Sequence, residues 1–181
     1  MMSEDDTRVP DVAAALERAR DVLTRRPAAG LHDDATGFAR WAGGVRVVTR
    51  HANGREVATD MPGELGGTGR EVSPGWMVRA GIAACATTTI ASVAAVEGVA
   101  LDALEVQVTS RSDTRGYLGL AEADGEAVYP GPHALAMHVR IAARGVSAER
   151  LKALVATAQR RAPMTAALLD AHDLALEVET A

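Results

Sequence analysis

Cysteine and aromatic side chains are scarce in this sequence. Of its 181 residues only one is a cysteine, Cys85, so no disulfide can form within one chain and nothing indicates an oxidising compartment. Aromatic residues make up 3% of the chain, and the apolar mass is Ala, Val and Leu. The sequence therefore predicts a core that gains its density from small side chains in close contact. We expect Trp41, Trp76 and Tyr117 in that core or at the mouth of an interface pocket.

The chain also lacks the charge and the motifs that several classes of protein require. Its formal net charge of −5 and pI near 5.5 give no general attraction to nucleic acid or acidic membranes, so we expect neither as a partner. The five histidines show no metal-ligand spacing. The glycine-rich stretch Gly66–Gly69 lacks the Gly-Lys-Ser/Thr sequence of a phosphate loop. We therefore expect no metal and no cofactor. The acidic, polar start of the chain is no signal peptide, which predicts a cytoplasmic protein.

The segment from Ser73 to Glu97 carries the strongest helix signal. Ser73 and Pro74 form a helix-start pair, with Ser at the N-cap and Pro at the first helical position. No charged residue occurs between Ala80 and Val96, and Cys85 lies within this run. A helix that is apolar all round is buried all round, so we expect it at the centre of the fold. The run is shorter than the ~20 apolar residues of a membrane span.

Hydrophobic periodicity divides the rest of the chain into helices and strands. Spacings of three and four residues predict an amphipathic helix over 10–26, after a disordered tail, and a second helix that Ser147 caps and Pro163 breaks or kinks. Asn53-Gly54 is typical of a hairpin turn. The predicted strands span residues 38–41, 45–50, 55–60, 101–110, 117–123, 133–143 and 174–178, and a short helix spans 165–170. Connections too short for parallel crossovers predict an α+β fold with mostly antiparallel pairing.

Five motifs follow one another in a specific order. They are Glu64-Leu-Gly-Gly67, Ser73-Pro74, Ala80-Gly-Ile-Ala-Ala-Cys85, Leu104–Ser110 and Arg161-Ala-Pro-Met-Thr165. Together they resemble the OsmC/Ohr family of osmotically inducible and organic-hydroperoxide-resistance proteins. The likeness defines an OsmC-like domain over 38–181, preceded by a tail and amphipathic helix over 1–30. It implies curved antiparallel sheets around a buried central helix, in an intertwined homodimer with active sites at the subunit interface.

The resemblance also implies roles for individual residues. Cys85 matches the reactive cysteine of the family, which reduces organic hydroperoxides with the help of an Arg and a Glu. Arg46 and Arg70 both remain candidates for that thiolate partner, because the loops ahead of the helix vary in length. The sequence departs from the family at two positions. Ala162 stands where the family has its second cysteine, and Gly75 stands where the peroxidases carry the helper Glu.

Two functions remain open on this evidence. The first is a one-cysteine thiol peroxidase of the oxidative stress response, in which an organic hydroperoxide oxidises Cys85 to a sulfenic acid and an external thiol restores it. The alternative is a non-catalytic protein that binds a small apolar ligand at the dimer interface, in a pocket lined by Trp76, Met77, Cys85 and Met164. The helix over 10–26 lies outside the family core, and we expect it to pack across its own dimer or to dock a partner.

Overall fold

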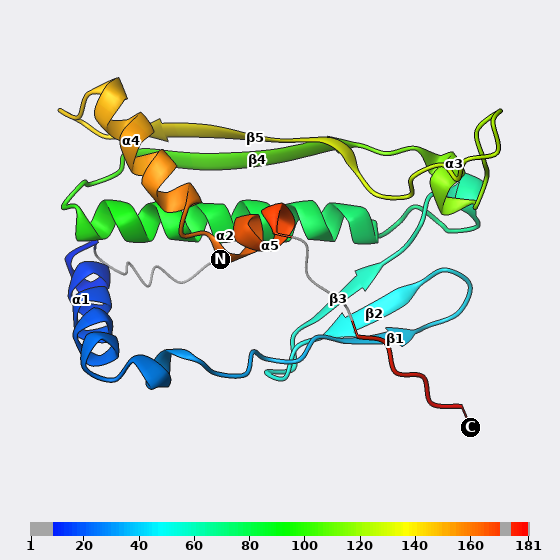
Figure 1. Ribbon diagram of the computed structural model, residues 1–181, viewed down its shortest axis with the longest axis horizontal. Coiled ribbons are helices and arrows are strands. Elements are labelled where there is room, and N and C mark those ends of the chain that lie inside the picture. The colour runs from blue at the N-terminus through cyan, green and yellow to red at the C-terminus, as the bar shows by residue number, and fades with distance from the viewer. Residues whose placement is uncertain (1–8, 171–174, 181) are drawn as a thin grey trace. The chain divides into compact units, whose positions relative to one another are not determined.

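The computed structural model describes residues 9–170 and 175–180, which fall into two compact units (Figure 1). The N-terminal unit is Ala14–Gly81. The C-terminal unit is formed by Ile82–Ala181 with the start of the chain up to Ala13, as far as these residues are described. Each unit contains one antiparallel sheet, which confirms the predicted fold class. Residues 1–8, for which a disordered tail was predicted, lie outside the described residues.

The N-terminal unit holds a three-stranded sheet of order β1-β2-β3. Helix α1 (Val9–Arg25) and a short 3-10 helix (Pro27–Gly30) precede strands β1 (Phe38–Trp41), β2 (Val47–Arg50) and β3 (Glu56–Thr59). The turn at Asn53-Gly54 joins β2 to β3, with Arg50 opposite Glu56. Gly54 adopts a φ of 86°, which an L side chain rarely reaches. The predicted hairpin is therefore confirmed.

A buried carboxylate organises the loop between β3 and α2. Asp60 is 3% exposed. Its Oδ2 accepts hydrogen bonds from the Thr68 hydroxyl (2.6 Å) and the Thr68 backbone N–H (2.7 Å), and its Oδ1 accepts one from the Met61 N–H (2.8 Å). The Thr68 hydroxyl is the main reason that the pKa of Asp60 is lowered. Gly67 passes so close that a Cβ there would overlap the Met61 carbonyl. The loop is thus a compact turn with its polar groups satisfied.

Helix α2 (Pro74–Val96) begins and ends as the sequence predicts. The Trp76 N–H donates to the Ser73 hydroxyl (3.1 Å), which is an N-cap bond. At the other end Gly98 has a φ of 68°, and the Val99 N–H bonds the Ala94 carbonyl. By its length and composition alone, this helix could cross a membrane. Ile90, Val93 and Ala94 of this helix belong to the hydrophobic core cluster of the C-terminal unit.

Burial of α2 on every side, however, was the wrong expectation for a single chain. One face is buried, and another is exposed although it bears no charge after Arg79. The buried residues are Ile82, Ala86, Ile90, Val93, Ala94 and Ala95. The exposed residues of the charge-free part are Gly81, Ala84, Thr88, Ala91 and Val96. The aromatic residues Trp41, Trp76 and Tyr117 are also exposed, by 70%, 49% and 59%, so they do not fill the core of the single chain.

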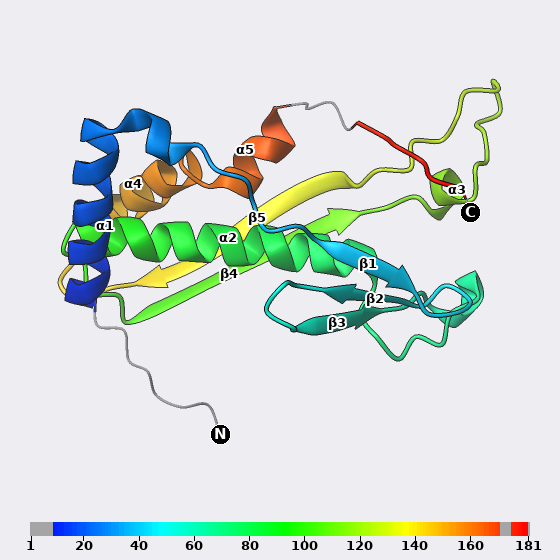
Figure 2. The same ribbon diagram turned by 90° about the horizontal axis from the view of Figure 1, so that it is seen from below.

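The core of the C-terminal unit lies between α2, a two-stranded ladder and one more helix (Figures 1 and 2). Strands β4 (Ala103–Arg111) and β5 (His133–Ala142) pair antiparallel, and helix α4 is Ala148–Gln159. Alternate residues of β4 point inward, as the sequence pattern predicts. Ile90 of α2 and Leu154 of α4 are each 1% exposed and belong to the same buried cluster. Ser147 caps α4 through the Arg150 N–H at 3.2 Å, as expected.

Two predicted strands are absent from the described residues. Residues 117–123 were expected as a strand, but helix α3 (Thr114–Tyr117) and a turn occupy this region, with only an isolated bridge between Ala121 and Ala127. Residues 175–178 form no strand, and Leu174 lies outside the described residues. The last helix, α5 (Pro163–Leu169), starts at Pro163 itself, because proline is well suited to the first helical position.

Candidate functional site around Cys85

Cys85 lies at the edge of the buried face of α2. It is a free thiol and is half-buried. Its neighbours along the buried face, Ile82 and Ala86, are covered, whereas Ala84 on the other side is exposed. The Thr89 hydroxyl donates to the Cys85 carbonyl at 2.8 Å, which satisfies that hydroxyl within the helix. The geometry therefore leaves the side chain of Cys85 in partial contact with solvent rather than sealed in the core.

The two candidate arginines belong to the N-terminal unit, whereas Cys85 belongs to the C-terminal unit. The guanidinium of Arg46 forms an ion pair with Glu71, with 3.6 Å between Nη2 and Oε1. The backbone N–H of Arg70 donates to the Thr68 hydroxyl at 3.4 Å. The pairing of either arginine with Cys85 stays a prediction. Sequence reasoning missed Glu71, because only the tertiary fold brings it to Arg46.

The two positions that depart from the expected family pattern differ in their surroundings. Ala162, in place of the second cysteine, is 1% exposed and occupies the N-cap position of α5. Gly75, in place of the helper Glu, lies in the first turn of α2, and a Cβ built there would meet only the Arg79 side chain, at 3.6 Å. A Cβ therefore fits at position 75 in the single chain, so crowding within the chain does not require glycine there. At position 162 a larger side chain would start from a buried position.

The predicted ligand pocket draws on both units. Trp76 and Met77 lie in the N-terminal unit, and Cys85 and Met164 in the C-terminal unit. Trp76 and Met164 are exposed, by 49% and 48%, and Met77 is half-buried. Whether these side chains surround one cavity stays a prediction. Their exposure does leave them free to contact a ligand or a second chain.

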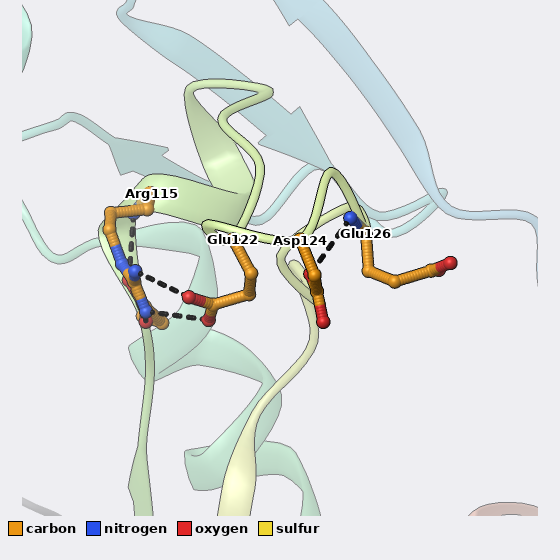
Figure 3. Close-up of polar contacts among 5 residues, drawn as sticks. Arg115, Glu122, Asp124 and Glu126 are labelled. Carbon is orange, nitrogen blue, oxygen red and sulfur yellow. Dashed lines mark hydrogen bonds and ion pairs between the residues drawn. The ribbon is translucent and has the colours of Figure 1, made fainter.

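An ion-pair cluster in the segment after β4 was not foreseen from the sequence. Arg115 binds Asp113 (Nη2 to Oδ2, 2.6 Å) and Glu122 (Nη2 to Oε1, 3.0 Å), as the close-up of Arg115 and Glu122 shows (Figure 3). Hydrogen bonding to Arg115 lowers the pKa of Asp113, and the two carboxylates raise the pKa of Arg115. The spacing Asp-x-Arg was the only local signal. Because these charged groups pair with one another, the cluster stabilises this segment and provides no reactive group.

No cluster of three or more His, Cys, Asp or Glu side chains that could hold a metal ion occurs in residues 9–170 and 175–180. The central helix carries the free thiol of Cys85. A thiolate is a nucleophile toward the peroxide oxygen and toward disulfides, and its reactivity depends on the groups that stabilise its charge. Cys85 is the side chain on which such a reaction depends in this sequence.

Comparison with known proteins identifies the fold. An OsmC-like protein from Mycoplasma pneumoniae superposes with a TM-score of 0.63 at 18% identity, over 77% of this chain and 89% of that one. The organic hydroperoxide resistance protein OsmC from Legionella pneumophila gives a TM-score of 0.55 at 24% identity, over 76% and 91%. An OsmC-like protein of unknown function from Vibrio cholerae gives 0.58 at 10% identity, over 75% and 93%.

The family assignment comes from the sequence. No curated relative matches the chain. The family described as OsmC-like protein matches residues 67–177, which is more than half of the chain and includes α2, the β4–β5 ladder and α4. Four of the five motifs that suggested the family lie within the matched region, and the first, Glu64–Gly67, overlaps it only at Gly67. The chain belongs to the family of OsmC-like proteins.

Proposed function

We propose that this protein is a thiol-dependent reductase of organic hydroperoxides that works with a single cysteine. In the first step the Cys85 thiolate attacks the peroxide oxygen, the O–O bond breaks, and the alcohol leaves after taking up a proton. The sulfur becomes a sulfenic acid and the peroxide is reduced by two electrons. An external thiol then forms a mixed disulfide with Cys85 and releases water, and a second external thiol frees Cys85 and leaves as the oxidised disulfide.

The observation that carries this proposal is the partial exposure of Cys85 on the central helix of an OsmC-like fold. A fully covered thiol would exclude a peroxide and a reducing thiol. The similarity to a protein named for organic hydroperoxide resistance supports the substrate class. The external reductant follows from the sequence, because Ala162 provides no sulfur and the chain contains no other cysteine.

We further propose that the protein acts as a homodimer in the cytoplasm. The exposed face of α2, formed by Gly81, Ala84, Thr88 and Ala91, has small side chains and no charge. Small residues allow two helices to approach closely, and covering this face removes apolar area from water. Helix α1 also leaves Val22 and Leu23 exposed, by 43% and 41%, so it offers a second apolar surface to a partner chain. Sedimentation of the full chain measures whether it dimerises. Sedimentation of a chain lacking residues 1–30 measures whether α1 contributes to the dimer.

Peroxide consumption tests the proposed reaction. The full chain with cumene hydroperoxide and excess dithiothreitol is expected to turn over, and Cys85→Ser is expected to abolish turnover while leaving the circular dichroism spectrum unchanged. Iodoacetamide labelling at pH 7 gives an independent measure of the thiol. Fast labelling of the native protein supports the proposal. Labelling that becomes fast only in denaturant, together with no peroxide consumption, would reject it.

The second candidate function is non-catalytic binding of a small apolar ligand. The observation that favours it is Gly75, because its position has room for a Cβ yet carries no carboxylate. Trp76, Met77, Cys85 and Met164 would line that site. Native mass spectrometry of the purified protein would reveal a retained apolar ligand, and Cys85→Ser would retain it as well, whereas peroxidase turnover would be lost in the same variant. The two functions therefore give opposite results for one substitution.

A further inference from the structure

An apolar cavity in the C-terminal unit is lined by other residues than those considered so far. Its volume is about 320 Å³, near the lower end of the ~300–1,000 Å³ typical of small-molecule sites. Four elements form it, namely α2, the β4–β5 ladder, the end of α4, and α5. Ile82, Val108, Met137 and Leu168 contribute apolar walls. Trp76, Met77, Cys85 and Met164, which define the predicted ligand pocket, are not among its lining residues.

Two of the polar groups in the cavity wall are committed to the protein. The Gln159 amide nitrogen donates to the Met137 sulfur, and the Gln159 amide oxygen accepts from the Thr165 hydroxyl at 3.2 Å. These bonds link the end of α4 to β5 and to α5. Gln159 and Thr165 therefore hold the walls in place, and their hydrogen-bonding capacity is largely used.

Arg160 is the charged residue among those that line the cavity. Its Nη2 donates to the Thr157 hydroxyl at 3.2 Å. No carboxylate lies within ion-pair distance of Arg160 in the described part of the chain. A guanidinium carries five N–H donors in a planar fork that matches the two oxygens of a carboxylate. The cavity thus combines an apolar interior with one exposed cation in its wall.

We propose that this cavity binds a small amphiphilic carboxylate, with the alkyl chain among the apolar walls and the carboxylate on Arg160. The charge decides between ligand classes. An alkylamine would place like charges together, and a neutral alcohol would leave the guanidinium with a weaker acceptor. A second protein chain laid over the cavity with its own apolar side chains would cover an unpaired cation, which is costly. The proposal is independent of the chemistry of Cys85.

Calorimetric titration of the full chain with octanoate, 1-octanol and octylamine tests the charge requirement. Octanoate is expected to bind saturably, one molecule per chain, and 1-octanol at least about tenfold more weakly, as the loss of a charge-assisted hydrogen bond predicts. Octylamine is expected not to bind. The same titration of Trp76→Ala separates the cavity from the predicted ligand pocket, because Trp76 does not line the cavity and octanoate affinity should not change in that variant.

Matched variants locate the ligand. Arg160→Gln is expected to weaken octanoate binding by about tenfold or more. Arg161→Gln removes the same charge one residue further on, outside the cavity lining, and is expected to leave the affinity unchanged. Ala136→Phe places a ring at a lining position on β5 that is exposed, and it is expected to block binding while the circular dichroism spectrum stays that of the parent. If Ala136→Phe does not fold, the comparison of Arg160→Gln with Arg161→Gln decides whether octanoate binds at Arg160.

Several outcomes would overturn the proposal. An equal loss of octanoate affinity in Arg160→Gln and Arg161→Gln would indicate a general charge effect. Equal affinity for octanoate and 1-octanol would show that the carboxylate is not recognised. Loss of binding in Trp76→Ala would place the ligand at the predicted pocket of Trp76, Met77, Cys85 and Met164. A change of sedimentation coefficient in Ala136→Phe, with no octanoate binding to the parent, would mean that a second copy of the chain covers the cavity.

Discussion

Leu154 is the residue of α4 on which the packing of this helix depends most. Its side chain is 1% exposed and contacts a cluster that includes Ile90 and Val93 of α2. Substitution by Ala removes three carbon atoms, which at ~0.8 kcal/mol per buried methylene is about 2.4 kcal/mol of transfer free energy. The cavity left behind adds to this, so we expect Leu154→Ala to lower the free energy of unfolding by about 3–5 kcal/mol.

Urea denaturation followed by circular dichroism measures this loss. The protein concentration must be the same for every variant, since association would make the midpoint depend on concentration. Leu31→Ala provides the matched control, because Leu31 is 90% exposed and its removal should change the free energy of unfolding by less than about 0.5 kcal/mol. Equal effects of the two substitutions would refute the assignment of α4 to the core.

Three further predictions concern a loop, a strand and the site. Asp60 has a lowered pKa in the folded protein, so its contribution to stability is present above about pH 4 and is lost as the pH falls through the folded pKa. In Thr68→Val the free energy of unfolding should therefore fall less on acidification than in the parent. An equal fall in both proteins would contradict the role of the Thr68 hydroxyl. Ala134, with a φ of 48°, should gain up to about 1 kcal/mol on change to Gly and lose stability on change to Val in thermal denaturation; the reverse order would refute strain. Ala162→Cys should form a disulfide with Cys85 after hydroperoxide treatment, seen as loss of both free thiols by mass spectrometry; two free thiols would argue against a family-like geometry.

The elements that the sequence predicts best are those set by local chemistry. Ser73 and Ser147 cap helices because a hydroxyl needs only the next turn of backbone, and both bonds are present. Asn53-Gly54 makes its hairpin for a similar reason, because Gly54 tolerates a positive φ. The alternation of β4 also survives, since one face of that strand meets the core.

The failures come from contacts that an alternating pattern does not encode. Residues 117–123 alternate like a strand, but Arg115 ties Asp113 to Glu122 and closes a turn there. Residues 174–178 alternate too, yet no strand pairs with the described residues 175–178 in the single chain. An alternating pattern reports which side chains prefer burial, and it does not supply the neighbouring strand.

For the site, the sequence identifies the thiol but not its surroundings. Cys85 is recognisable from its motif on the charge-free part of α2. The ion pair between Arg46 and Glu71 depends on how a hairpin strand meets the segment ahead of α2, which no local pattern encodes. The cavity beside Arg160 likewise forms from four separate elements. Motifs therefore identify the candidate reactive atom, and only the fold gives the groups around it.

The central claim is that Cys85 is the group that reduces organic hydroperoxides, and stopped-flow mixing with cumene hydroperoxide followed by mass spectrometry of the thiol tests it most directly. We predict rapid consumption of one peroxide per chain and a Cys85 peptide heavier by one oxygen atom, which dimedone traps as a sulfenic acid. An unmodified Cys85 with no peroxide consumed would contradict the account.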